Sequence, residues 1–256
     1  MLKRFLRLAV VIFGILAVVS AGTALAEDHG HECAGLPSAG QLHSYLMAAA
    51  TGTGVSGPLG PGTSAGGLFG GTRMWGAVVN RDGELCVSVT STVDPTQVWP
   101  GSQAIAKAKG YTANAFSVDI LALSTARLYL FVQPGHSLYG LNNSNPFDPQ
   151  FLAPPAGEGG QKGNIAGGII TFGGGVPLYN TAGKIIGGLG VSGDTACADH
   201  EVAKRARDLA GLNPPGGPLA DEIVYTIVDG PSVFGHPVCL NTLRNGVFIG
   251  SETPAP

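Results

Sequence analysis

NIAGGIITFGGGVPLYNTAGKIIGGLGVSGDTACADHEVAKRARDLAGL, residues Asn164–Leu212, decides the fold of this chain. The first half of this stretch predicts two strands joined by a turn. Ile169–Phe172 is β-branched and aromatic, Asn180–Gly183 supplies residues that favour a reversal, and Lys184–Ser192 alternates apolar residues with glycine. Three glycines at 173–175 free the backbone where the chain must change direction after the first strand.

The second half of the same stretch predicts an amphipathic helix. Asp194 or Thr195 can cap the first free N–H groups, and Gly211 closes the end. The helix carries two pairs of opposite charge that we expect to face solvent, Glu201 with Arg205 and Lys204 with Asp208.

The rest of the chain predicts mixed α and β structure. Apolar spacing and turn residues give the further elements. These are a helix over Pro37–Ala50, a glycine-rich loop over Thr51–Gly71, a hairpin over Met74–Thr92, helices over Ser102–Phe116 and Asp119–Val132, and an edge strand over Glu222–Val228.

The first 26 residues predict a secretory signal peptide. Lys3, Arg4 and Arg7 precede an apolar run, and Ala24-Leu25-Ala26 forms an A-x-A cleavage site. No later stretch is long and apolar enough to predict a membrane anchor after signal cleavage. We therefore expect a periplasmic or secreted protein.

Charge and cysteine content narrow the function classes. A net charge of −3 with 12% charged residues argues against nucleic-acid binding, which needs a basic surface. Cys33, Cys86, Cys197 and Cys239 all follow the signal peptide, so two disulfides are expected, with three possible connectivities. None lies in a C-x-x-C pair, which argues against a structural zinc site and against covalent c-type haem.

Three motifs, in order along the chain, resemble the GlcG/HbpS family of haem-associated proteins. They are the hairpin segment MWGAVVNRDG from Met74, the helix SQAIAKAKGYTA from Ser102, and GGGVPLYNTAGKIIGGLGVSGDT from Gly173. The resemblance implies a single α/β domain with a profilin-like antiparallel sheet of about five strands, flanked by helices. The chain then divides into a signal peptide (1–26), an N-terminal helix and loop (27–73), the family-like domain (74–212) and a C-terminal extension (213–256). We expect each disulfide to tie an extension to this domain.

The family resemblance also implies a haem pocket between the Ser102–Phe116 helix, the His136–Leu141 loop and the Gly173–Gly175 turn. Haem, or another flat small molecule, needs a slot lined by small residues, a cation for its acid groups and a donor to the metal. The expected pocket residues are Lys109, Thr112, His136, Gly174, Gly175 and His200, with His136 the first and His200 the second candidate iron ligand.

The leading function is exported haem binding for scavenging, storage or sensing, and two alternatives stay open. One is a small-molecule enzyme of the periplasm that uses the same pocket or a site around His200 and His236. The other is a structural subunit of an oligomer, and the family resemblance implies homo-oligomers in any case. No catalytic motif supports the enzyme: Gly188-x-Gly190-x-x-Gly193 lacks the acidic residue of a dinucleotide site, and Gly62–Gly66 lacks the strand-to-helix elbow of hydrolases.

Overall fold

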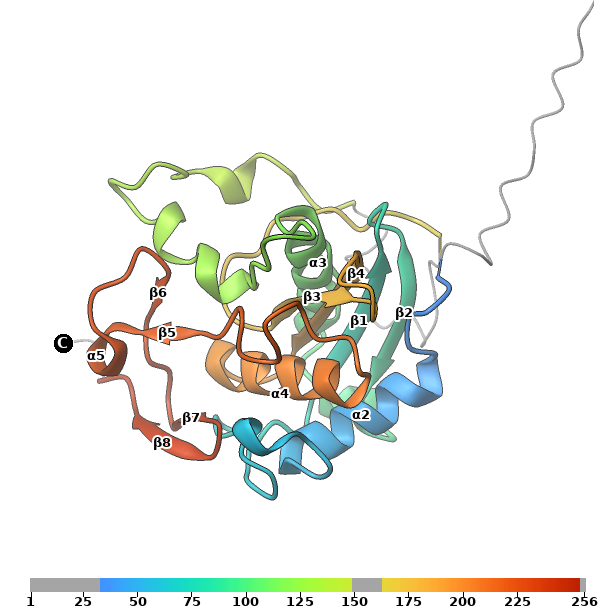
Figure 1. Cartoon of the computed structure of the whole chain (residues 1–256), viewed down its shortest axis with the longest axis horizontal. Coiled ribbons are helices and arrows are strands. Elements are labelled where there is room, and N and C mark those ends of the chain that lie inside the picture. Colours follow the sequence, from blue (N-terminus) through green and yellow to red (C-terminus); the bar gives the residue numbers. More distant parts are fainter. Residues whose placement is uncertain (1–32, 149–162, 254–256) are drawn as a thin grey trace, which may run out of the picture.

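Four antiparallel strands form the central sheet, in the order β2-β1-β4-β3 (Figure 1). The computed structural model describes residues 33–148 and 163–253, so the predicted signal peptide lies outside the described residues. The strands of the sheet are β1 (Trp75–Asn80), β2 (Leu85–Thr90), β3 (Gly175–Tyr179) and β4 (Ile185–Ser192). The α/β class with an antiparallel sheet is confirmed, but this sheet has four strands where about five were expected.

Each face of the sheet is covered by helices (Figure 1). Helix α3 (Gly101–Ala115) packs on one face, against β1, β3 and β4. Helices α2 (Ala39–Thr51) and α4 (Ala196–Leu209) pack against each other and on the other face. Period-two alternation of the strands produces the two layers: Ala77 and Val79 lie in the α3 cluster, whereas Val78 lies in the α2–α4 cluster.

Glycines on β4 set the distance between the sheet and α3. A Cβ atom added to Gly190 would collide with the carbonyl oxygen of Ala106, and one added to Gly188 would collide with that of Gly110. Gly110 itself faces the β4 backbone, since its Cβ would lie 3.1 Å from the Gly190 nitrogen. The alternation of glycine in β4 therefore serves backbone-to-backbone packing.

Two extensions outside the sheet are joined to it and to each other. Disulfides link Cys33 to Cys86 and Cys197 to Cys239, so each ties an extension to the family-like domain as expected. A β-bridge between Gly66 and Thr242 connects the glycine-rich loop to the C-terminal segment. The remaining elements are the short strands β5 (Val224–Tyr225), β6 (Gly235–His236), β7 (Thr242–Arg244) and β8 (Val247–Gly250), helix α5 (Thr226–Asp229), and 3₁₀ turns at Gly57–Leu59, Pro95–Gln97, Thr125–Leu128, Leu130–Val132 and Leu141–Asn143.

Three sequence-based element predictions were wrong. Ile169–Phe172 is not a strand, and the first strand of that pair begins at Gly175. Asp119–Val132 is not a continuous helix, because the Ser117 hydroxyl accepts from the Leu123 N–H and so competes with helical bonding at its start. Of the predicted edge strand Glu222–Val228, only the two residues of β5 are extended, and α5 follows directly.

The charged side of α4 is buried, which corrects the expectation that it faces solvent. Glu201 and Arg205 do pair, at 3.1 Å, but both are about 1% exposed or less. Lys204 pairs with Glu201 and Glu222 instead of Asp208. The two extensions cover this side, since Arg205 donates hydrogen bonds to carbonyls of the N-terminal loop and Lys204 to Asn245. Within the described residues, no helix has the length and apolar character needed to cross a membrane.

Candidate functional site

Lys109 and Asp199 form a buried ion pair between α3 and α4. Lys109 Nζ lies 2.7 Å from Asp199 Oδ2 and donates a second hydrogen bond to the Val191 carbonyl at 3.0 Å. The other carboxylate oxygen of Asp199 accepts from the N–H groups of Gly193 and Asp194. Both charges are therefore matched by partners within the protein, and Lys109 is fully buried.

Burial disfavours the charged form of both members of this pair. It lowers the pKa of Lys109 below its usual value, while Asp199 opposes that effect. It raises the pKa of Asp199 to about 6, against the attraction of Lys109. The pair survives burial because short hydrogen bonds from both sides satisfy the carboxylate.

The other residues predicted near Lys109 are closely packed. Thr112 is buried, donates to the Ala108 carbonyl within its own helix and accepts from the Ile170 N–H. A Cβ atom on Gly174 would lie 2.6 Å from Lys109 Nζ, and one on Gly175 would lie 2.5 Å from the Lys109 carbonyl oxygen. The glycines thus make room for Lys109 itself and not for a ligand.

The two candidate iron ligands lie in different environments. His200 is about 1% exposed, and its Nε2 lies 3.4 Å from Glu222 Oε1. Burial alone would raise the pKa of Glu222, but Lys204 and His200 together hold it below its usual value. His136 lies on an exposed turn, where its backbone N–H donates to the Gln133 carbonyl. The structure thus gathers Lys109, Thr112, Gly174, Gly175 and His200 in one packed region, and His136 is not part of it.

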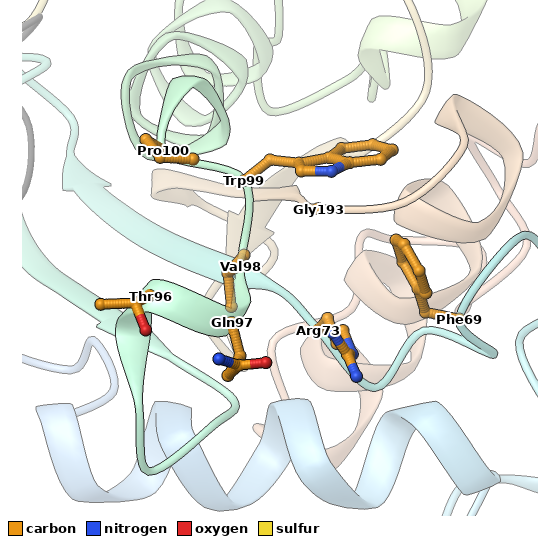
Figure 2. Close-up of a pocket in the computed structure, with 8 residues that line it drawn as sticks. All are labelled: Phe69, Arg73, Thr96, Gln97, Val98, Trp99, Pro100 and Gly193. Carbon is orange, nitrogen blue, oxygen red and sulfur yellow. The ribbon is translucent and has the colours of Figure 1, made fainter.

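An open pocket lies at the start of α3, outside the predicted region (Figure 2). Figure 2 shows the Trp99 indole and the Phe69 ring on one side of it, with the Arg73 side chain beside them. Its volume is about 220 Å³, and Thr96, Gln97, Val98, Pro100 and Gly193 complete the lining. The ring centroids of Phe69 and Trp99 are 5.5 Å apart in an edge-on arrangement, and the Arg73 guanidinium lies 5.3 Å from the Phe69 centroid.

This pocket offers a planar apolar surface next to a positive charge. Trp99 is 49% exposed although it is large and aromatic, so about half of its surface is open to a ligand. Arg73 is exposed, and the N-terminal end of α3 adds a partial positive charge. A flat molecule with acidic groups suits these features.

Sequence reasoning missed this pocket because its residues come from three separate segments. Phe69 lies at the end of the glycine-rich loop and Arg73 just after it, Trp99 precedes α3, and Gly193 follows β4. One signal of the pocket was present in the sequence, the pair Trp99-Pro100 just before a predicted helix. A tryptophan at that position has few residues nearby in the sequence against which it can pack.

Residues 69–208 match the family model described as haem degrading protein HbpS-like. The chain belongs to this family. The HbpS-like region includes every strand of the central sheet together with α3 and nearly all of α4. The predicted membership of a haem-related family is therefore confirmed over the part of the chain that forms the α/β fold.

Curated relatives cover only part of this chain. The corrinoid adenosyltransferases PduO of Citrobacter freundii and Salmonella typhimurium are 31% and 32% identical over 112 residues, which are 44% of this chain and 25% of each relative. An uncharacterized 15.0 kDa protein from the dhaT-dhaS intergenic region of Citrobacter freundii is 35% identical over 94 residues, 37% of this chain and 51% of that protein. The matched region thus spans about a quarter of the PduO proteins and half of the shorter one.

Three solved structures are similar to this chain over about two thirds of its length. Klebsiella pneumoniae protein ORFY and a PduOC:heme complex each have a TM-score of 0.45 and 24% identity. Each match covers 68% of this chain, together with 87% of ORFY and 92% of the PduOC:heme structure. HbpS has a TM-score of 0.41 and 18% identity, over 66% of this chain and 86% of that structure.

Proposed function

We propose that this protein is an exported haem-binding protein that serves in scavenging, storage or sensing. The observation that carries the proposal is the HbpS-like match over residues 69–208, because that family is defined by its relation to haem. Export rests on the predicted signal peptide (1–26) with its A-x-A site. Two disulfides that tie the extensions to the domain suit an oxidising compartment.

The packed region around Lys109 does not fit haem. Any atom added at Gly174 or Gly175 meets protein atoms, and the charge of Lys109 is already matched by Asp199. A propionate could pair with Lys109 only by displacing a carboxylate that holds two further hydrogen bonds. We therefore place the proposed ligand elsewhere than the sequence predicted.

The pocket in Figure 2 fits one edge of haem. Trp99 would stack on the porphyrin plane, and Arg73 would pair with a propionate. A volume of about 220 Å³ is below the ~300–1,000 Å³ typical of enclosed ligand sites, so one chain would cover only part of the ring. A homo-oligomer, which we also propose, would allow a second copy to cover the remaining surface.

No lining residue of this pocket carries an imidazole or a thiol. The protein's contribution there would be stacking and charge pairing, and the porphyrin supplies the iron chemistry when bound. His136 and His200, the predicted first and second candidates for an axial ligand, do not line this pocket, so they stay proposed ligands for a haem site outside it.

Haemin titration of the mature protein tests the proposal. We expect a saturable Soret shift at a stoichiometric ratio. Trp99→Ala and Arg73→Gln should each weaken binding roughly tenfold, because a lost stacking contact or charge-assisted hydrogen bond costs about 1–3 kcal/mol. Phe248→Ala is the matched control, since Phe248 is a 61% exposed aromatic residue outside the pocket.

The outcomes separate the pocket from the function. Absence of a saturable shift with wild-type protein would refute haem binding and leave the small-molecule enzyme ahead. A normal shift in all pocket variants, combined with a changed spectrum in His136→Ala, would move the site to the His136 turn.

A further inference from the structure

A cluster of three metal-ligating side chains lies where the C-terminal segment meets α4. One ligand atom from each of Cys197, His236 and Cys239 falls within 4.8 Å of the other two. All three residues are buried, and the two cysteines form a disulfide in the structure. The same three groups form a Cys₂His set once the sulfur–sulfur bond is reduced, a donor set that suits Zn²⁺.

His236 is already held as a metal-binding histidine would be. Its Nδ1 lies 2.7 Å from the Pro237 carbonyl oxygen, which can only accept, so Nδ1 carries the proton and Nε2 carries the lone pair. Ligating histidines commonly donate their other N–H to a backbone carbonyl in this way. Among the described residues, Nε2 accepts one long hydrogen bond, of 3.3 Å, from the Gly173 N–H.

The position of Cys197 favours a thiolate after reduction. It lies in the first turn of α4, a 14-residue helix whose N-terminal end stabilises negative charge. Its backbone N–H lies 3.2 Å from Cys239 Sγ and donates to it. The other disulfide, Cys33–Cys86, has no such third donor among the described residues.

We propose that Cys197, His236 and Cys239 form a convertible cross-link, a disulfide when oxidised and a site for one Zn²⁺ or similar thiophilic cation when reduced. The fourth coordination position would be left to water. The C-terminal segment would then stay attached to α4 in both redox states. This site needs no C-x-x-C pair, because two donors lie in His236-Pro-Val-Cys239 and the third is 42 residues away from Cys239.

The conversion uses a dithiol as the reductant. A thiolate of the dithiol attacks the sulfur of Cys239, because that residue is 8% exposed and Cys197 only 1%, and Cys197 leaves as a thiolate. The second thiol of the reductant then displaces Cys239 and completes a disulfide in the reductant. Two electrons and two protons pass to the cysteines, and Zn²⁺ binding releases both protons.

Cobalt binding to the reduced full-length mature protein tests this proposal. The protein is reduced with a phosphine without oxygen, freed of reductant and titrated with Co²⁺. We expect one Co²⁺ per chain, with thiolate-to-cobalt charge-transfer bands that one equivalent of Zn²⁺ abolishes. The unreduced protein should give no such bands.

Three variants identify the donors. Cys33→Ala/Cys86→Ala should keep the bands, Cys197→Ala/Cys239→Ala should lose them, and His236→Ala should weaken Co²⁺ binding tenfold or more. Far-UV circular dichroism before and after metal addition reports folding in each case.

The proposal is overturned if reduced wild-type protein gives no charge-transfer bands. It is equally overturned if His236→Ala binds with unchanged affinity, because two thiolates of an unfolded chain would behave in that way. Loss of the bands in Cys33→Ala/Cys86→Ala, with native circular dichroism, would assign the metal to the wrong cysteine pair and also refute it.

Discussion

Replacing Lys109 with methionine should destabilise the fold by about 3–5 kcal/mol, because it leaves the buried Asp199 carboxylate without its cation. Methionine keeps most of the side-chain volume, so the effect comes from the lost ion pair and the lost bond to the Val191 carbonyl. For a domain of this size, such a loss corresponds to a fall in melting temperature of roughly 6–20 °C. Haem affinity of the folded fraction should not change, because Lys109 lies outside the pocket of Figure 2.

Urea unfolding at pH 7 and pH 5 measures this effect and its cause. Without Lys109, the folded-state pKa of Asp199 should rise above its present value of about 6, while the unfolded value stays near 3.8. The folded variant then binds more protons than the unfolded chain between these values, so its stability increases as the pH falls through that window. The destabilisation relative to wild type should therefore be smaller at pH 5.

The double variant Lys109→Met/Asp199→Asn is the control. It removes both charges, so it should be more stable than Lys109→Met alone. A single variant within about 1 kcal/mol of wild type, or a double variant that is no better than the single one, would refute the reasoning.

Two further predictions concern packing and acid stability. Gly190→Ala should destabilise the fold by several kcal/mol in urea unfolding, because the added Cβ collides with the Ala106 carbonyl. Gly101→Ala is the control: its Cβ meets nothing within 4 Å, so this variant should be neutral or mildly stabilising. His236 should contribute stability that is present above pH 6.5 and lost as the pH falls to about 4, because the unfolded chain takes up the proton first. At about 1.4 kcal/mol per pKa unit this loss is at most ~3.5 kcal/mol. His236→Asn should flatten the stability curve between those pH values, and an unchanged slope would contradict the assignment.

Local patterns in the sequence predicted the parts of the fold that depend on neighbouring residues. Thr195 caps α4 by accepting from the Ala198 N–H, and the hairpin of β1 and β2 turns between Asn80 and Leu85 as expected. The first strand of the Gly175–Ser192 pair was misplaced because Ile169–Phe172 has strand composition. The Thr125 hydroxyl donates to the Phe172 carbonyl there, and within residues 33–148 and 163–253 no strand pairs with Ile169–Phe172.

The predicted site could not be completed from the sequence because its pairing is long-range. Lys109 and Thr112 were found on the correct helix, but only the fold shows that Asp199, 90 residues later, already occupies the charge of Lys109. The environment of His236 was equally hidden, since Gly173 and Cys197 reach it from elements far away in the sequence.

Burial of the α4 charges by both extensions also bears on how far this domain can be exchanged between proteins. Arg205 donates to carbonyl oxygens of Leu59 and Thr63, and Lys204 donates to Glu222 and Asn245. The two cations lie within residues 69–208, but these four partners lie outside that range. A graft limited to the family region would carry two cations cut off from these partners. Recombination with a relative should therefore preserve the helix together with both flanking segments, as one inherited unit.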